Sequence, residues 1–350
     1  MKALFLPLYP PETASSRYRI YQYLPLLRDL GVEPEVYPAP SAALWAAAGA
    51  SRRGRLALEA AYVRTALARA RAAPKYDAVM IQKAVTPSML RGLASLLRRR
   101  CRVLFYDIDD AVYVSPPHQF RGAARLLQRR SEAEELARSA DAVLAGSGEL
   151  VRWAGEVGGN PILLPTCVDA DRFAPAAERP SSVVGWIGSP STAEALSLAA
   201  GPLSRACEWT GARFVAVGAG GLPDGVHGES AAWSLEGEAG AVASFAVGIA
   251  PLPDTPWNRG KCALKALLYM SCAVPVVASP VGALKEVVVD GETGFLARND
   301  AEWENALVRL LSDGQLRRRM GEAGRQRVLS HYSIGVGAEI MARALRGEVG

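Results

Sequence analysis

The chain has 350 residues, of which 50% are hydrophobic and 21% are charged. This balance excludes a disordered tail and a coiled coil, and the length is sufficient for two domains of ordinary size. No apolar segment approaches the roughly 18 residues that span a bilayer. The five cysteines show no C-x-x-C spacing, which argues against a zinc site and a disulfide framework. We therefore expect a globular cytoplasmic protein.

Positive charge is concentrated in the first half of the chain. Residues 1–170 hold 23 lysines and arginines against 16 aspartates and glutamates, whereas residues 171–350 hold 17 against 19. Arginine clusters within 52–71, 98–100 and 121–130 could dock on the inner face of an anionic membrane, at about 1 kcal/mol for each charge. The alternative is a set of solvated helix faces, and the sequence leaves both open. The arginines are not interleaved with aromatic residues, so we expect no nucleic-acid partner.

The first half alternates apolar strands with amphipathic helices. Ser15 and Ser16 are candidate caps for the first helix, and Gly31 is a candidate terminator. This order of elements predicts a Rossmann-like domain. The expected strands are 3–9, a segment around residue 36, 77–82, 103–106 and 141–147, and the expected helices are 17–30, 41–73 with breaks at Gly49 and Gly54, and 88–100.

An acidic cluster follows the strand at 103–106. Asp107, Asp109 and Asp110 would repel one another unless a metal, a base or a substrate hydroxyl engaged them, and crowding would raise at least one pKa. Taken alone, the D-x-D pattern suits the nucleophile and acid of a haloacid-dehalogenase-type phosphatase or the metal-binding pair of a GT-A glycosyltransferase. Helix capping with solvated neighbours is the structural alternative for each aspartate. His118, in a Pro-Pro-His-Gln loop, is either a surface histidine or a site residue.

The second half begins after a polar, proline-bearing run at 175–182, which we interpret as a linker. Its strands are apolar along their whole length, as in a parallel sheet covered on both faces. The expected elements are a strand at 183–187, a small-residue loop from Gly188 into a helix, a strand at 214–218, a strand and loop at 245–256, a helix at 259–270, a strand at 274–279, a turn at 280–286 and a hairpin-like segment at 290–296.

Basic residues gather where this sheet is expected to bind a ligand. Ligands of such sheets lie beyond the carboxyl ends of the strands. Arg259, Lys261 and Lys265 fall at the start of the expected helix, where free N–H groups and the helix dipole already favour an anion such as a diphosphate. Lys261 and Lys265 would share one helix face. The alternative is a pair of solvated charges on a surface helix.

Several fixed-spacing motifs then carry a resemblance. The segments 251–253, 257–265, 269–270, 275–282 and 290–296 together resemble the carboxyl-terminal half of family 4 glycosyltransferases of the GT-B fold, in the branch that reads R-G-K-C. The runs Y-D-I-D-D and G-W-I-G-S-P-S-T resemble the same branch. The resemblance implies an α/β protein with two Rossmann-like domains facing each other across a cleft. It places an acceptor-side domain at 1–174, a nucleotide-sugar domain at 183–332, and a last helix at 333–350 that could return to the first domain.

The resemblance also implies an activity and a set of site residues. The expected reaction moves a sugar from a nucleotide diphosphate-sugar to a glycan or lipid-linked acceptor, with retention, in cell-envelope polysaccharide biosynthesis. It requires no metal and no cofactor. Asp107, Asp109 and Asp110 would orient the acceptor. The donor would contact Gly188, Ser189, Pro190, Trp233, Ser234, Arg259, Lys261, Lys265, Leu268, Gly282, Ala283, Leu284 and Glu286, and the acceptor side of the cleft would include Ser16, Arg17, Arg19 and His118.

The chain departs from this pattern at four positions. Gly260 and Leu268 stand where typical members carry two glutamates, the second of which holds the ribose hydroxyls. Ala273 replaces a usual glycine and Ala246 a usual aspartate. A lost contact to a charged group would cost on the order of 1.5–3 kcal/mol. Two alternatives therefore stand beside the enzyme: a degenerate, non-catalytic nucleotide-sugar-binding or scaffold protein, and a phosphatase that uses Asp107 and Asp109.

Overall fold

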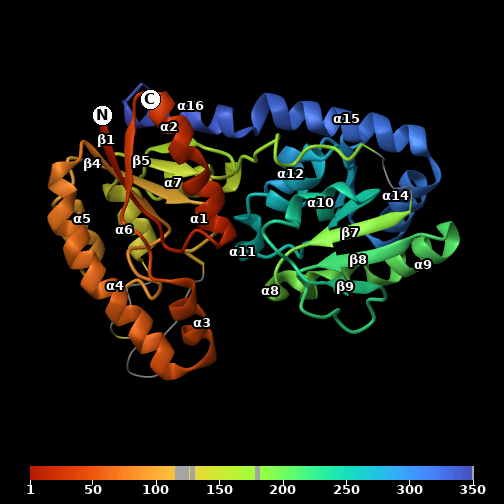
Figure 1. Ribbon diagram of the computed structural model, residues 1–350, viewed down its shortest axis with the longest axis horizontal. Coiled ribbons are helices and arrows are strands. Elements are labelled where there is room, and N and C mark those ends of the chain that lie inside the picture. The colour runs from red at the N-terminus through yellow and green to blue at the C-terminus, as the bar shows by residue number, and fades with distance from the viewer. Residues whose placement is uncertain (115–125, 127–130, 178–181, 349–350) are drawn as a thin grey trace. The chain divides into compact units, whose positions relative to one another are not determined.

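The chain folds into two compact units, each built on its own parallel sheet (Figure 1). The structure is a computed structural model that describes residues 1–114, 126, 131–177 and 182–348. Unit 1 comprises Met1–Thr166 and Gly337–Gly350, and unit 2 comprises Cys167–Val336. The final helix, α16 (Ile334–Leu345), therefore lies mostly in unit 1, where the Nη1 of Arg346 donates to the carbonyl of Leu30 at 3.1 Å.

The sheet of unit 1 has the order β2-β1-β3-β4-β5-β6, with every pair parallel. Its inner strands β3 and β5 are buried at every position, as expected for a sheet covered on both faces, while the edge strand β2 alternates between exposed and buried. The strands are β1 (Lys2–Leu6), β2 (Glu33–Val36), β3 (Ala78–Gln82), β4 (Val103–Ile108), β5 (Ala142–Ala145) and β6 (Pro161–Leu163).

The helices of unit 1 are more interrupted than the sequence pattern predicts. The expected helix at 17–30 is three short helices, because the backbone at Ile20 leaves the helical region and Pro25 begins a new turn. The alanine-rich segment breaks at Ser51, which caps the next helix, and not at Gly49 or Gly54. The helices are α1 (Ala14–Arg19), α2 (Leu24–Asp29), α3 (Ala42–Ala50), α4 (Arg52–Ala72), α5 (Leu93–Arg98), α6 (Glu132–Ser139) and α7 (Gly148–Glu156), with 3-10 turns at Tyr21–Tyr23 and Ala73–Lys75.

The sheet of unit 2 has the order β12-β11-β10-β7-β8-β9 and is also parallel throughout. The segment at 290–296 was expected to close a hairpin, but β12 pairs in parallel with β11 after a tight turn at Asp290, whose side chain accepts from the N–H of Leu296. The strands are β7 (Val183–Ile187), β8 (Arg213–Val217), β9 (Glu229–Ala231), β10 (Val247–Ala250), β11 (Val276–Ala278) and β12 (Gly294–Leu296).

The helices of unit 2 cover a core that includes Trp186, Phe214, Ile249 and Trp303. In Figure 1 the long helix α15 is one continuous blue ribbon that follows α14 in the chain. The helices are α8 (Pro190–Ala193), a 3-10 helix at Glu194–Ala199, α9 (Ala200–Thr210), α10 (Glu238–Ala243), α11 (Pro256–Arg259), α12 (Leu264–Ser271), α13 (Leu284–Val287), α14 (Asp300–Ser312) and α15 (Gly314–His331).

The predicted helix at 259–270 is wrong at its start. The structure contains the short helix α11, capped by Thr255 and opened by Pro256, and then a separate helix α12. Between them Ala263 adopts a left-handed conformation with φ 56°, which no α-helix can contain. Arg259 and Lys261 therefore lie before α12, and Lys265 alone of the three basic residues falls in its first turn.

Both sheets have a topological switch point. In unit 1 the chain leaves β1 for β2 on one side and returns to β3 on the other; in unit 2 it runs from β7 outward through β8 and β9 and returns to β10. Loops that leave the two strands in opposite directions open a crevice beyond their carboxyl ends, where ligands of such folds bind. These two sheet edges are where functional residues are expected.

Candidate functional site

Tyr269 of α12 joins the two strands at the switch point of unit 2. Its hydroxyl accepts a hydrogen bond from the N–H of Ile187 at 3.0 Å and donates one to the carbonyl of Ile249 at 3.2 Å. Burial raises the pKa of this phenol, so it stays protonated at neutral pH. The strand ends from which the loops at Gly188 and at 252–261 depart are thereby held at a fixed spacing.

Lys265 stands at this edge beside the loop at Gly188. A Cβ at Gly188 would lie 2.9 Å from the Cε of Lys265, and the ammonium of Lys265 lies 5.2 Å from the centre of the buried Trp186 ring. The aromatic face supports the lysine stem while the side chain keeps partial exposure. Ser189 and Pro190, which follow, are exposed. The arrangement leaves a cation next to a small-residue loop at a strand end.

Trp233 lies next to the same loop. Gly218 has a φ of +81°, and a Cβ there would collide with the carbonyl oxygen of Gly188 and approach the Cβ of Trp233 to 3.1 Å. Only glycine allows this close approach. The indole is 38% exposed, and its Nε1 lies 3.3 Å from Oε1 of Glu238.

A partly buried ion pair holds the segment around Trp233. Glu238 is 5% exposed and pairs with Arg172 at 3.0 Å, and the same guanidinium donates to the carbonyl of Leu235 at 2.6 Å. Ser234 is turned inward to its own loop, since its Oγ accepts from the N–H of Gly237. Trp233 therefore sits on a rigid support, and Ser234 is engaged in the turn that presents it.

The loop between β10 and α12 presents two more basic residues. Arg259 forms a fork with Asp254, with Nε 2.6 Å from Oδ1, and both side chains are more than half exposed. Hydrogen bonding to Arg259 lowers the pKa of Asp254. Lys261 lies 5.6 Å from the centre of the Trp257 ring. The predicted helix face shared by Lys261 and Lys265 does not exist, because only Lys265 lies in α12.

The turn after β11 supplies backbone donors. Gly282 has a φ of +52°, and a Cβ there would collide with the carbonyl oxygen of Arg259, so the turn and the basic loop touch. The N–H groups of Leu284, Lys285 and Glu286 bond to carbonyls within the turn. Within the described part of the chain, no hydrogen bond takes up the N–H of Gly282 or Ala283. The side chains of Ala283 and Leu284 are buried, whereas Glu286 is exposed.

The side chain of Leu268 is apolar and buried, so it offers no hydrogen bond at this edge. It is 3% exposed and belongs to the buried face of α12. The apolar side chain is sealed in the helix packing and offers no hydrogen bond, and a donor contact at this position stays a prediction.

The switch point of unit 1 is tied together by Gln82, the last residue of β3. Its Oε1 accepts from the N–H of Leu8 at 3.2 Å and from Ser16 Oγ at 2.6 Å, and its Nε2 donates to Ser15 Oγ at 3.1 Å. The two serines expected as helix caps serve this network, while Thr13 occupies the cap position of α1 without a side-chain bond. The β1 loop, α1 and β3 are thereby locked together.

Asp107 is buried inside β4 and pairs with Arg19. Both side chains have no exposed surface; Nε of Arg19 lies 3.1 Å from Oδ1, and Nη1 donates to the carbonyl of Leu164. Burial raises the pKa of Asp107 and Arg19 opposes that shift, while the carboxylate raises the pKa of Arg19. Neither side chain touches solvent in this structure, and the catalytic role of Asp107 and the acceptor contact of Arg19 stay predictions.

Asp109 and Asp110 follow the end of β4 and converge on Lys83. The ammonium of Lys83 lies 3.0 Å from Oδ1 of Asp109 and donates to Oδ2 of Asp110. The side chains of Asp109 and Asp110 are 12% and 22% exposed. Ser15 Oγ donates to Oδ2 of Asp109 at 2.8 Å. Of the three aspartates, these two keep some exposed side-chain surface, although Oδ1 of Asp109 is itself buried.

The other residues predicted on the acceptor side, Ser16, Arg17 and His118, differ in their exposure and in whether the structure describes them. Ser16 is fully buried and cannot contact a ligand. Arg17 is partly exposed, and its Nη1 donates to the carbonyl of Glu12 at 3.1 Å. His118 lies outside the described residues.

Sequence reasoning missed Lys83, Gln82 and Tyr269. The signal for the first two was present, because a Gln-Lys pair directly follows the all-apolar strand at 78–81. Tyr269 had no such signal, since a tyrosine among apolar residues of a helix normally indicates core packing.

The described ranges contain neither a metal-binding cluster nor a helix that could cross a membrane. Among residues 1–114, 126, 131–177 and 182–348, no group of three His, Cys, Asp or Glu side chains is placed to hold a metal ion. Within the same ranges, no helix combines the length and apolarity needed to cross a membrane.

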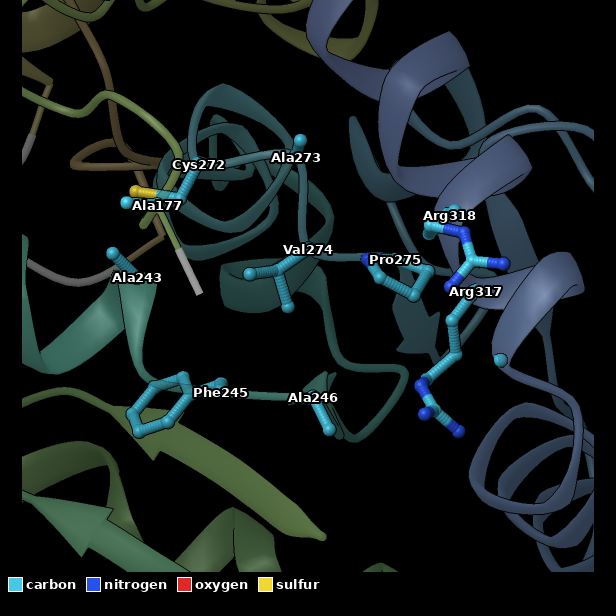
Figure 2. A pocket seen from close by; sticks show the side chains of 11 residues that line it. Ala177, Ala243, Phe245, Ala246, Cys272, Ala273, Val274, Pro275, Arg317 and Arg318 are labelled. Atoms are coloured by element: carbon cyan, nitrogen blue, oxygen red, sulfur yellow. The ribbon is translucent and has the colours of Figure 1, made fainter. Parts of the chain in front are cut away.

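A cavity of about 350 Å³ lies at the opposite edge of the unit 2 sheet (Figure 2). Phe245 and Val274, which precede β10 and β11, line it together with the buried Cys272 and the arginine pair at 317–318. Arg317 is occupied, since its Nη1 donates to the carbonyls of Leu310 and Leu311 at 2.7 Å and so caps the end of α14. Burial and Arg318 lower the pKa of Arg317. We assign this cavity no part in the site at the carboxyl ends of the strands.

Comparisons with known proteins bear on both units. Residues 182–313 match the family of glycosyl transferases group 1. Alpha-maltose-1-phosphate synthase of Mycobacterium tuberculosis is 42% identical over 72 residues, which are 18% of this chain and 19% of that protein. D-inositol 3-phosphate glycosyltransferase of Stackebrandtia nassauensis is 42% identical over 59 residues, 16% of this chain and 13% of that protein. The chain thus spans about a fifth or less of the length of these relatives.

Solved structures match over nearly the whole chain. Sucrose-phosphate synthase from Thermosynechococcus elongatus aligns with a TM-score of 0.73 at 17% identity, covering 99% of both chains. HepE from Anabaena in complex with UDP-glucose aligns with a TM-score of 0.67 at 17% identity, covering 99% of this chain and 100% of that one. These likenesses confirm the predicted fold: two parallel six-stranded sheets with helices, as in GT-B glycosyltransferases. Residues 182–313 thus resemble glycosyl transferases group 1, within a chain that has the GT-B fold.

Proposed function

We propose that this protein is a glycosyltransferase that uses a nucleotide diphosphate-sugar as donor. The observation that carries the proposal is the carboxyl edge of the unit 2 sheet. There Lys265, the loop at Gly188 and the N–H groups of Gly282 and Ala283 gather at a topological switch point, inside the segment that matches glycosyl transferases group 1. Cations and free N–H groups are what a diphosphate requires.

The proposed donor contacts follow from chemistry. Lys265 would bind the diphosphate, Arg259 and Lys261 would add charge from the preceding loop, and Gly282 and Ala283 would donate to sugar or phosphate oxygens. The exposed Trp233 would border the nucleobase. Structures titled as complexes of HepE with UDP and with UDP-glucose support a uridine nucleotide as the first donor to test.

The proposed reaction belongs to family 4 and retains configuration at the anomeric carbon. The bond between the anomeric carbon and the diphosphate oxygen breaks, a bond to an acceptor hydroxyl oxygen forms, and the hydroxyl proton passes to the leaving diphosphate. Cationic groups at Lys265, Lys261 and Arg259 would stabilise the charge that develops on the leaving group. This scheme requires no metal.

The acceptor is proposed to bind unit 1 through Asp109 and Asp110. Carboxylates accept hydrogen bonds from hydroxyl groups, so a glycan or lipid-linked glycan suits them. The excess of basic residues in residues 1–170 supports a peripheral position on the inner face of the membrane, in cell-envelope polysaccharide biosynthesis.

One observation favours a second candidate, a nucleotide-sugar-binding protein without catalysis. The resemblance expects a carboxylate for the ribose at position 268, and the structure has a leucine sealed in the packing of α12. Nothing in the described structure supports the phosphatase alternative, because both oxygens of Asp107 face Arg19 and none reaches solvent.

A panel of nucleotide-sugars tests the proposal. The full chain is incubated with UDP-, GDP- and ADP-sugars, and thermal stabilisation and release of free nucleotide are followed with and without glycan acceptors. We expect one donor class to stabilise the protein and to be turned over. Stabilisation without turnover in the presence of every acceptor would favour the binding protein, and no response to any donor would contradict both.

A further inference from the structure

We propose that Lys83 is a positioning residue that acts as the built-in counter-cation of Asp109 and Asp110 in unit 1. Its catalytic consequence rests on the proposed function, whereas its electrostatic role stands on the geometry of unit 1 alone. An acidic D-x-D-D sequence at a strand end usually implies an external cation. Here a lysine of the neighbouring strand provides the positive charge.

The contacts of Lys83 define this role. One ammonium group contacts both carboxylates, at 3.0 Å from Oδ1 of Asp109 and as a hydrogen-bond donor to Oδ2 of Asp110. The ring of Tyr9 lies over the same nitrogen, 5.4 Å from its centre. The lysine side chain is 3% exposed, so its positive charge is balanced by the two aspartates inside unit 1 and hardly by solvent. The two aspartates that it contacts are more exposed than the lysine, at 12% for Asp109 and 22% for Asp110.

The backbone at Lys83 is specialised for this contact. Successive side chains of a strand point to opposite faces, yet Gln82 bonds to Ser15 and Lys83 bonds to Asp109, the partner of Ser15. The two side chains converge because Lys83 adopts a left-handed conformation with φ 60°. Such a conformation is unusual for a residue with a side chain and persists where its surroundings enforce it.

Two hydrogen bonds enforce the left-handed turn. The N–H of Lys83 donates to the carbonyl of Asp107 at 2.8 Å, and its carbonyl accepts from the hydroxyl of the buried Tyr106 at 2.7 Å. Both partners belong to β4, the strand whose end carries the aspartates. The position of the ammonium is therefore fixed by the same strand that it neutralises, as positioning requires.

The electrostatics of the cluster follow from its members. Among the described residues, Lys83 faces Asp109, Asp110 and Tyr9; the Arg19–Asp107 pair, Tyr106 and Glu132 lie behind them. Burial lowers the pKa of Lys83, but the two aspartates raise it well above its ordinary value. Burial raises the pKa of Asp109, and Lys83 and Arg19 bring it below its ordinary value. With Lys83 present, Asp109 is ionised at neutral pH, and a carboxylate accepts hydrogen bonds from hydroxyl groups.

Unfolding of full-length variants tests the electrostatic claim. Lys83→Met, Lys83→Arg and Lys83→Met combined with Asp109→Asn are compared with the wild type in urea from pH 4.5 to 8. Without Lys83 the buried carboxylate of Asp109 loses its counter-charge and is repelled by Asp110, so the folded pKa of Asp109 rises and stability is lost as pH rises through it. We expect the deficit of Lys83→Met to be largest at pH 8, to shrink toward pH 4.5, and to be reduced by Lys83→Arg and by the added Asp109→Asn. A deficit independent of pH would overturn the proposal.

A kinetic readout separates positioning from mere stability. Nucleotide release from UDP-glucose and other UDP-sugars is measured against pH with glycan acceptors, and UDP binding is measured by calorimetry. Lys83→Met is expected to move the acid limb of kcat/KM upward by about one pH unit or more, to raise the acceptor KM, and to change UDP affinity less than twofold. An unshifted acid limb in a variant that binds UDP normally would overturn the positioning role. If the wild type binds no nucleotide, the proposed function fails, and the unfolding series still decides the role of Lys83.

Discussion

The two sheet edges place their charges in opposite ways. At the edge of unit 1, Arg19 is fully buried, Lys83 is 3% exposed, and both are paired with aspartates of the same unit. At the edge of unit 2, Arg259 is 52% exposed and Lys265 lies on the face of Trp186 with partial exposure. The basic side chains at the edge of unit 1 are thus buried, whereas those at the edge of unit 2 are at least partly exposed to solvent.

This difference indicates two kinds of function. Buried pairs are strongly destabilising to break because the surviving charge is left uncompensated, so they fix geometry. Exposed ion pairs such as Arg259 with Asp254 contribute little to stability, so their geometry can change when a ligand binds. We therefore expect substitutions in unit 1 to act mainly on folding and protonation, and those in unit 2 mainly on nucleotide binding.

Substitution of Asp107 is expected to cause the largest loss of stability. Asp107→Ala leaves the guanidinium of Arg19 buried and unpaired, which should lower the free energy of unfolding by about 3–5 kcal/mol. Urea denaturation at pH 7 measures the change. The matched control is Asp254→Ala, which breaks an exposed pair in unit 2 and should leave the urea midpoint unchanged. Equal effects of the two variants would contradict the contrast between the edges.

Gly282→Ala tests the contact between the turn and the basic loop of unit 2. A Cβ at Gly282 collides with the carbonyl of Arg259, in addition to the strain of a positive φ, so we expect a loss of about 3 kcal/mol and weaker UDP binding. Gly291 also has a positive φ but has open space around it. Gly291→Ala should cost about 1 kcal/mol and leave UDP binding intact. Indistinguishable variants would show that the two segments do not touch.

Alkaline pH should lower the free energy of unfolding, because a buried tyrosine lies at each switch point. Burial raises the pKa of Tyr106 and of Tyr269, whereas an unfolded tyrosine ionises near pH 10. The stability that these groups contribute is therefore complete below about pH 10 and declines above it. Tyrosinate absorbance should rise together with unfolding, and Tyr106→Phe should make the decline shallower while costing about 1 kcal/mol at pH 7. Ionisation of these tyrosines in the folded protein would contradict their burial.

Arg318→Ala should have the smallest effect. Arg318 is exposed at the cavity on the amino-terminal edge of the unit 2 sheet, away from the strand ends that carry Lys265. Calorimetry with UDP should give an affinity within twofold of the wild type. A tenfold loss would move the nucleotide site to the other edge of the sheet.

The sheets were predictable because their strands are apolar over their full length. The strands at 78–82, 183–187 and 247–250 read as buried, and the structure buries each of their residues. Parallel order follows from alternation with helices, and the position of ligand-binding loops follows from parallel order. The loop at Gly188 and the turn at Gly282 were located on this basis, and the structure brings both to one sheet edge.

The features that the sequence patterns did not predict depend on contacts between segments that are distant in the chain. Ala263 adopts a left-handed conformation at the start of α12, and no local signal marks an alanine for that role. Asp107 looked like its neighbours in the acidic run, but the strand extends through it and alternation turns it toward Arg19, 88 residues away. Lys83 was overlooked for the same reason, because its partners come from the next strand.

Calorimetric titration of UDP into Lys265→Met and Lys83→Met tests whether the nucleotide binds at the sheet edge of unit 2 and not at that of unit 1. The partly exposed Lys265 of unit 2 is proposed to bind the diphosphate, so Lys265→Met should weaken UDP binding by about tenfold or more, equivalent to a lost charged hydrogen bond. The internally paired cation of unit 1 should not matter, so Lys83→Met should bind UDP within twofold of the wild type. Normal UDP affinity in Lys265→Met, or loss of UDP binding in a folded Lys83→Met protein, would contradict the assignment of the two edges.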